Sequence, residues 1–148
     1  MPQFGAAEPG RSYRDRPAAF GIAERNGLIA LVRVRPASGG DWLDLPGGAV
    51  DPGEDELQAV VREFGEETGL VIATGLRIVG AAQYFVLSDG EPVNNLCGVY
   101  AVTVTGEDAS LKIEDDHTLV WIGADEAIRR LRHDAHAWAV AKWLRDKG

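Results

Sequence analysis

Residues 48–70 read GAVDPGEDELQAVVREFGEETGL, a stretch that joins a glycine-rich turn to a helical pattern dense in carboxylates. Apolar side chains recur in it at spacings of three and four residues, at Leu57, Val60, Val61 and Phe64. That spacing predicts one buried stripe along an α-helix. Acidic residues occupy the first turn, where the helix dipole favours negative charge, and Gly69 is a suitable C-terminal stop. The stretch therefore predicts a loop followed by an amphipathic helix.

The same helix carries three carboxylates on one face, because Glu63, Glu66 and Glu67 are three and four residues apart. Like charges at this spacing cost about 0.2–0.5 kcal/mol per pair in an isolated helix. A divalent cation would explain that cost, since Mg²⁺ prefers oxygen ligands. The alternative is a solvated acidic face in which Arg62 pairs with Glu66. The pattern leaves both interpretations open.

The flanking segments predict strands on either side of this helix. Two apolar runs, residues 18–24 and 27–34, are separated by Arg25-Asn26-Gly27, which is a strong hairpin signal. Further short strands are expected at 42–45, 76–87, 95–105 and 117–123, and a final helix at 124–147, with a break near His133-Asp134. We expect an α+β fold with a mixed β-sheet, in which residues 1–16 form a flexible N-terminal arm and residues 17–148 a single domain.

Charge and cysteine content limit the classes of partner and the cellular compartment that we expect for this chain. The chain has 15 Lys and Arg against 23 Asp and Glu, a net charge of -8, which disfavours nucleic-acid polymers and anionic membranes. A small phosphorylated molecule held through a divalent cation is compatible with this charge. The single cysteine, Cys97, indicates a reducing compartment, and no signal peptide or bilayer-spanning apolar run is present, so we expect a cytoplasmic protein.

The stretch 48–70 resembles the Nudix box, the signature of the Nudix (MutT-like) hydrolases: Gly, five residues, Glu, seven residues, then Arg-Glu-apolar-x-Glu-Glu-x-Gly-apolar. The seven fixed positions are filled by Gly48, Glu54, Arg62, Glu63, Glu66, Glu67 and Gly69. Phe64 stands where an aliphatic residue is more usual, which affects packing rather than chemistry. The resemblance implies an α/β/α sandwich with a loop-helix-loop. It also implies Mg²⁺-dependent hydrolysis, with Mn²⁺ as a substitute, of a nucleoside diphosphate linked to another moiety X.

Roles follow from the resemblance, residue by residue. Glu66 and Glu67 would be the principal metal ligands, and Glu63 would complete the cluster or act as general base. The carbonyl of Gly47 would be a further ligand. Arg62 would orient the carboxylates, Glu54 would support the loop or the helix start, and Gly48 and Gly69 would serve the backbone conformation.

Outside the box the candidates are fewer. Nudix hydrolases often use another acidic residue, and Glu114 is our candidate among Glu114, Asp115 and Asp116, with a solvated acidic loop as the alternative. Arg33 and Arg35 share one face of a strand, where they would either meet substrate phosphates or face solvent. Tyr84 would contact substrate or belong to the core. The histidines His117, His133 and His136 have no zinc-site spacing and are interpreted as surface or packing residues.

A (deoxy)nucleoside triphosphate or related nucleotide is the expected substrate. The alternatives are ADP-ribose, a nucleotide sugar or a dinucleoside polyphosphate. Two further alternatives belong to other classes of function. One is a non-catalytic nucleotide-binding sensor with the Nudix fold, and the other is an acidic interaction domain without a metal site. Sensors of this kind usually lose box carboxylates, whereas this box is whole. The resemblance leaves a homodimer open.

Overall fold

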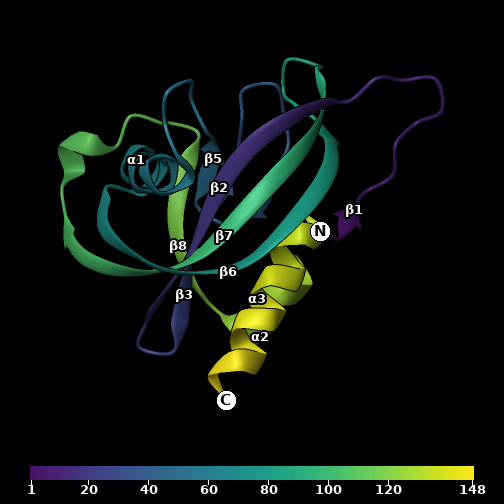
Figure 1. The fold of residues 1–148 in the computed structure, drawn as a ribbon. Helices are drawn as coiled ribbons and strands as arrows, with labels where there is room; N and C mark the ends of the chain where they lie inside the picture. The colour runs from purple at the N-terminus through teal and green to yellow at the C-terminus, as the bar shows by residue number, and fades with distance from the viewer.

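The computed structural model describes residues 1–148 and has an α+β architecture (Figure 1). Its strands are β1 (Gln3–Phe4), β2 (Arg14–Arg25), β3 (Leu28–Val34), β4 (Trp42–Asp44), β5 (Gly47–Ala49), β6 (Leu70–Val86), β7 (Pro92–Glu107) and β8 (His117–Gly123). Its helices are α1 (Glu56–Thr68), the 3₁₀ turn η1 (Ala109–Leu111), α2 (Ala124–Arg130) and α3 (Asp134–Lys147). The sheet order is β1-β6-β7-β2-β3-β4, with β5 paired to β2 and β8 to β3. Because β2 runs parallel to β7 and antiparallel to β3, the sheet is mixed, as predicted.

The predicted hairpin joins β2 to β3. Glu24 pairs with Ile29 and Arg25 with Leu28, which leaves Asn26 and Gly27 as the two turn residues. Both have left-handed backbone angles, with φ of 53° and 78°, and a two-residue turn between twisted strands needs that conformation. The Asn-Gly pair therefore determines the register of this hairpin.

Strand β2 separates two layers of the core. Its residues Ala18, Phe20 and Ile22 pack in a cluster with Ala139 and Val140 of α3. The residues that alternate with them, Ala19 and Ala23, pack in a second cluster with Val60 and Phe64 of α1. Side chains on a strand point alternately to its two faces, so α1 and α3 cover opposite faces of the sheet (Figure 1). This confirms the α/β/α sandwich.

Helix α1 has the predicted ends, but the face that it buries differs from the predicted one. It begins with a capping box, in which the Asp55 side chain accepts from the backbone N–H of Gln58, and it ends at Gly69, whose φ is 76°. The predicted stripe is only half correct: Val60 and Phe64 are buried, but Leu57 and Val61 are each 41% exposed. The helix is rotated about its axis relative to the expected orientation. That rotation turns Glu67 inward.

Residues 1–16, which the sequence predicts as a flexible arm, contact the sheet near the start and near the end of this segment. Gln3 and Phe4 pair with Ala82 and Gln83 of β6, and the ring of Phe4 lies 5.8 Å from that of Trp138 on α3. Strand β2 begins at Arg14, three residues before the expected domain start. The parallel partner β7 supplies the reason, since it continues the ladder as far as Val93 opposite Arg14.

At the other end of the chain, the predicted break in the final helical segment falls at residues 131–133, between α2 and α3. Leu131 forms a bridge with Leu43, and the backbone N–H of Arg132 donates to the carbonyl of Leu43 at 2.9 Å. The break is thus docked onto β4. Neither α2, α3 nor any other helix has the length and apolar character needed to cross a membrane.

Candidate active site

Arg62 links the loop before α1 to the carboxylates on the helix. Its Nε and one terminal nitrogen bond both oxygens of Glu54, at 2.8 and 2.9 Å, and the same terminal nitrogen reaches the carbonyl of Ala49 at 3.0 Å. The other terminal nitrogen contacts Glu63 at 2.9 Å and Glu66 at 3.1 Å. Hydrogen bonds from Arg62, and one from the backbone of Asp51, lower the pKa of Glu54 to about 2. Glu54 is therefore a permanent anion that anchors Arg62.

Glu67 is the most deeply buried carboxylate of the helix, with 5% of its surface exposed. One oxygen accepts from the backbone N–H of Gly47 at 3.1 Å, and the other lies 3.4 Å from Nε2 of His117. Burial first, and then repulsion from Glu63, raises the pKa of Glu67 well above its usual value. Burial also raises the pKa of Glu63, although Arg62 opposes the change. Carboxylates that are withdrawn from solvent and lie close to further carboxylates form a place where a cation would be stabilised.

Two glycines allow β5 to approach these carboxylates. A Cβ on Gly48 would lie 2.9 Å from the carboxyl carbon of Glu63. A Cβ on Gly47 would lie 2.2 Å from the carbonyl oxygen of Ala19, and the φ of Gly47 is 148°. Both positions therefore require glycine, for space in one case and for backbone conformation as well in the other.

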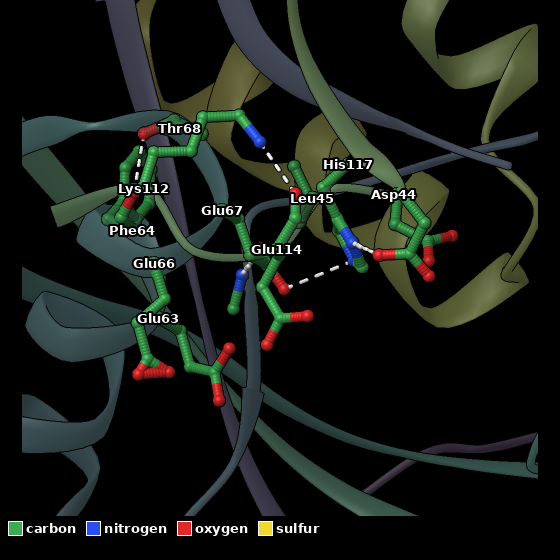
Figure 2. Close-up of polar contacts among 12 residues, drawn as sticks. Asp44, Leu45, Glu63, Phe64, Glu66, Glu67, Thr68, Lys112, Glu114 and His117 are labelled. Carbon is green, nitrogen blue, oxygen red and sulfur yellow. Dashed lines mark hydrogen bonds and ion pairs between the residues drawn. The ribbon is translucent and has the colours of Figure 1, made fainter. Parts of the chain in front are cut away.

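A second acidic group comes from the β7–β8 connection. Glu114, Asp116 and His117 offer ligand atoms that all lie within 4.8 Å of one another. Asp116 holds the Nδ1 atom of His117 at 2.7 Å. The backbone N–H of Glu114 donates to the carbonyl of Glu66 at 3.0 Å, which ties this connection to α1. Figure 2 shows the side chains of Glu63, Glu67, Glu114 and His117 directed into one region.

These groups line a cavity of about 630 Å³. Its lining includes the backbone and carboxylate positions Gly47, Gly48, Ala49, Glu63, Glu67, Glu114 and Asp116, together with His117. The lining also includes the aromatic rings of Phe20, Trp42, Phe85, His133 and His136, and the ion pair of Asp44 and Arg132. A volume of this size is typical of a small-molecule site and is large enough for a nucleotide.

Two histidines of the cavity lining, His133 and His136, are buried and neutral. Nδ1 of His136 accepts the backbone N–H of Leu45 at 3.2 Å, so the ring proton resides on Nε2. Burial lowers the pKa of His136 well below its usual value and that of His133 to about 4. The two rings meet edge to face at 5.2 Å, and Phe20 lies 4.4 Å from His136. Both residues are packed, as one of the sequence alternatives held, yet they also line the cavity.

Arg132 lies in the break between α2 and α3, and this position brings its side chain to the cavity. Its guanidinium bonds both oxygens of Asp44 and lies 4.7 Å from the ring centre of Trp42. Asp44 is 9% exposed, and the ion pair with Arg132 balances its negative charge. The arrangement places a polar ion pair in the cavity lining next to the ring of Trp42.

Arg16 also lines the cavity, although the sequence placed it in the flexible arm. One of its terminal nitrogens donates to Oδ1 of Asn95 at 3.0 Å. Burial is the largest influence on its pKa, which is lowered, and the nearby charge of Glu63 acts in the opposite direction. The only sequence signal for its position was that it directly precedes the apolar run of β2.

Three sequence candidates lie away from the cavity. On β3 the cavity is lined by Val32 and Val34, so Arg33 and Arg35 point to the opposite face, where both contact Asp41, at 2.8 and 3.4 Å respectively. Tyr84 packs 5.0 Å from Tyr13, while its neighbour Phe85 lines the cavity. In a strand, a shift of one residue exchanges the two faces. Of the acidic trio, Glu114 and Asp116 reach the cavity and Asp115 does not.

Comparison with known proteins agrees with this architecture. The family model described as the NUDIX domain matches residues 13–144. The chain is 32% identical over 111 residues to the CTP pyrophosphohydrolase of Escherichia coli, covering 73% of this chain and 76% of that protein. It is 31% identical over 121 residues to an 8-oxo-(d)GTP phosphatase of Mycolicibacterium smegmatis, covering 82% of this chain but 35% of that longer protein.

Solved structures show the same fold. A NUDIX hydrolase from Nitrosomonas europaea superimposes with a TM-score of 0.76 at 21% identity, covering 90% of this chain and 91% of its own. The box-like helix, the carboxylate cavity beneath it and a family match across most of the chain agree, and the protein belongs to the Nudix family of hydrolases.

Proposed function

We propose that this protein hydrolyses the phosphoric anhydride bond of a nucleoside diphosphate linked to another moiety, with a (deoxy)nucleoside triphosphate as the preferred class. The observation that carries the proposal is the buried Glu67 beside the partly buried Glu63 in the lining of a nucleotide-sized cavity. Carboxylates with raised pKa values inside a cavity are typical of sites that bind cations or transfer protons.

The donor set fits a hard divalent cation. Oxygen donors from Glu63, Glu66 and Glu67, the carbonyl of Gly47 and a carboxylate of Glu114 are the ligand type that Mg²⁺ or Mn²⁺ prefers. When bound, the cation neutralises the diphosphate and lowers the pKa of a coordinated water. The protein holds these ligands in place through Arg62, which contacts Glu63 and Glu66 and is itself anchored by Glu54. A carboxylate of the group then takes the proton of the attacking water.

The rest of the cavity suits a nucleoside. Trp42 and Phe85 provide flat apolar surfaces, Arg132 provides positive charge beside both rings, and Arg16 is a second guanidinium in the lining of the cavity. The two relatives above are named for action on nucleoside triphosphates, which supports that class for this chain. ADP-ribose is the alternative, supported by a shorter match, 43% identity over 54 residues, to the ADP-ribose pyrophosphatase of Methanocaldococcus jannaschii.

The setting of the protein belongs to the same proposal. The single free cysteine, Cys97, is buried, which suits a reducing, cytoplasmic compartment. We further propose that residues 17–148 function as one domain, with a homodimer as a permitted assembly.

The test is turnover of a nucleotide panel by wild type and by Glu67→Gln, with Mg²⁺ and with EDTA. The panel holds nucleoside triphosphates, oxidised triphosphates, ADP-ribose, nucleotide sugars and dinucleoside polyphosphates, and a coupled phosphatase makes both types of product visible. We expect Mg²⁺-dependent turnover that the substitution lowers at least about a hundredfold, because it removes one ligand charge at nearly constant volume.

Asp115→Asn is the matched control, since Asp115 is an acidic residue of the same connection that lies outside the cavity. It should turn over the panel like wild type. Full activity of Glu67→Gln would contradict the metal assignment. Silence of the wild type across the panel, with Mg²⁺ still bound, would replace the enzyme with a nucleotide sensor.

A further inference from the structure

Two polar side chains outside the carboxylate group lie side by side in the lining of the active-site cavity. Arg16 on β2 and Asn95 on β7 are partners in the parallel ladder between these strands, and both line the cavity. One terminal nitrogen of Arg16 donates to Oδ1 of Asn95 at 3.0 Å. We propose that Arg16 and Asn95 together bind oxygens of the phosphate chain of the substrate. This inference rests on the proposed function, because it names the part of the nucleotide that the pair holds.

Arg16 has no counter-ion in the protein. Arg14, two residues earlier, pairs with Glu91 at 2.9 Å, and Arg132, the other arginine of the lining, pairs with Asp44, whereas Arg16 forms no ion pair. Burial lowers the pKa of Arg16, and the charge of Arg14 lowers it further. A guanidinium nevertheless stays protonated in a protein. A partly buried cation without a counter-ion is stabilised by an anion that enters the cavity.

Asn95 adds an unused donor to the same place. The residue is 4% exposed, and its amino group has no acceptor in the protein. Because a guanidinium only donates, Oδ1 must face Arg16 and Nδ2 must face away from it. Every fully enclosed side-chain nitrogen or oxygen in this protein has a hydrogen-bond partner, so Nδ2 reaches open space, and Asn95 borders the cavity. A buried donor without a partner is costly, and an acceptor on a ligand would remove that cost.

The pair lies close to the strand that approaches the carboxylates. Two residues after Arg16, Ala18 pairs with Ala49 of β5. The carbonyl of Ala49 accepts from Arg62 at 3.0 Å, and Arg62 contacts Glu63 at 2.9 Å. The charge of Glu63 is near enough to oppose the effect of burial on the pKa of Arg16, although the two side chains form no ion pair. A phosphate chain bound through a cation at Glu63 would therefore have Arg16 as a neighbour.

The chemistry of the pair selects a phosphate rather than a base. A nucleobase offers neutral acceptors, mostly with donors beside them. Oδ1 of Asn95 is already used by Arg16, so the pair has no side-chain acceptor left for a donor of a base. Phosphate oxygens are anionic and only accept, and they match the planar fork of a guanidinium. The pair therefore presents donors and positive charge to a group that has acceptors and negative charge.

The first experiment measures binding, so that it does not depend on turnover. Calorimetry in the presence of Mg²⁺ compares inorganic tripolyphosphate with the α,β-methylene analogues of the nucleoside triphosphates, which resist cleavage at that bond. Loss of charge-assisted hydrogen bonds in Arg16→Met should weaken the binding of all these probes at least about tenfold and by the same factor for every base. Arg14→Met is the matched control, because it removes the same charge from the same strand outside the cavity, and it should bind like wild type.

A second variant separates binding from folding. Asn95→Asp is nearly isosteric and gives Arg16 a carboxylate partner, so it should leave the thermal midpoint close to that of wild type while weakening tripolyphosphate at least about tenfold. Asn94→Asp adds the same charge to the same strand, but Asn94 bonds Gln3 and does not line the cavity. That variant should keep the affinity for tripolyphosphate.

Two results would overturn the inference. One is wild-type affinity for tripolyphosphate in Arg16→Met or in Asn95→Asp. The other is a loss of affinity that depends on the base and spares tripolyphosphate, which would assign the pair to the base. Nucleotide turnover that Arg16→Met leaves unchanged in kcat/KM would also overturn it and leave the hydrolase function intact. Arg16-dependent binding of tripolyphosphate without turnover of any nucleotide would support the inference and contradict the proposed hydrolase function instead.

Discussion

At the scale of single residues, the site depends on how Arg62 satisfies several partners at once. Its two terminal nitrogens and Nε contact Glu54, Glu63, Glu66 and the carbonyl of Ala49. No ammonium group can reproduce this planar set of contacts. The residue therefore determines where two of the candidate metal ligands lie, without being exposed enough to be a surface ion pair.

Arg62→Lys should lower kcat/KM by about tenfold to a hundredfold, the range seen when a partner of a metal ligand is replaced. The reason is that lysine keeps the charge but loses the fork that positions Glu63 and Glu66. Steady-state kinetics at several Mg²⁺ concentrations measure the effect. The control is Arg77→Lys, because Arg77 makes one exposed contact, to Glu56, at 3.3 Å. Equal kinetics of the two variants would contradict a positioning role for Arg62.

At the scale of elements, helix α1, which carries the carboxylates, packs against β2. Gly21 of β2 faces the ring of Phe64, and a Cβ at that position would lie 2.7 Å from a ring carbon. The small residue on the strand and the large one on the helix are therefore complementary. This complementarity explains how an aromatic residue is accommodated at a box position that is usually aliphatic.

Gly21→Ala should lower the free energy of unfolding by about 1–3 kcal/mol, the usual cost of overpacking a core. Urea denaturation measures it. The double variant with Phe64→Leu should recover part of the loss, since the smaller side chain makes room for the added methyl group. Gly106→Ala on β7 is the control, because a Cβ there has no neighbour within 4 Å. If both single variants lose the same stability, the close approach is not the cause.

The break between α2 and α3 carries a pH dependence of its own. His133 is buried and its pKa is lowered from 6.5 to about 4, chiefly by burial. In the unfolded chain the residue titrates near 6.5, so stability is complete above that pH and is lost as the pH falls towards 4. This difference in pKa corresponds to a loss of about 3 kcal/mol in the free energy of unfolding once His133 is protonated in both the folded and the unfolded protein.

His133→Gln tests this, because glutamine is polar but does not titrate. Urea denaturation between pH 7 and pH 4 should show a smaller loss of stability for the variant than for the wild type. Some loss should persist, since the pKa of His136 is also lowered by burial. Parallel curves for the two proteins would show that His133 does not titrate as described.

At the scale of the whole molecule, a net charge of -8 sets two effects against each other. General repulsion among carboxylates is relieved by any salt. Inside the cavity, burial and the charge of Glu63 raise the pKa of Glu67, and a cation that enters the cavity would stabilise the charged carboxylates in a way that ionic strength alone does not. The two effects can therefore be separated by comparing a specific ion with ionic strength alone.

Mg²⁺ at ten times its dissociation constant should stabilise the folded protein by about 1.4 kcal/mol. For a chain of this length that is a rise of about 3–5 °C in the thermal midpoint. EDTA should reverse it, NaCl at equal ionic strength should not reproduce it, and Glu67→Gln should reduce it. A shift that NaCl reproduces in full would assign the effect to surface charge.

The residues alone predicted a large part of this molecule. The Asn26-Gly27 turn, the capped helix ending at Gly69 and the break near His133 all follow from local backbone preferences, which operate over a few residues. The spacing of Glu63, Glu66 and Glu67 follows from helix geometry in the same way. The family itself was recognisable from a continuous stretch of 23 residues, 48–70.

Tertiary structure decided what no local pattern contains. Helix α1 is packed with Glu67 buried and Leu57 exposed, and its Phe64 lies close to Gly21 of a strand that is distant in sequence. The arrival of Arg16, His117 and Arg132 in the cavity depends on sheet pairing and on a docked helix break. The opposite outcomes for Tyr84 and Phe85 depend on strand register, where one residue exchanges the faces. Local preferences determine the elements, whereas long-range packing determines which side chains meet, because the free energy of burial is shared among residues far apart in sequence.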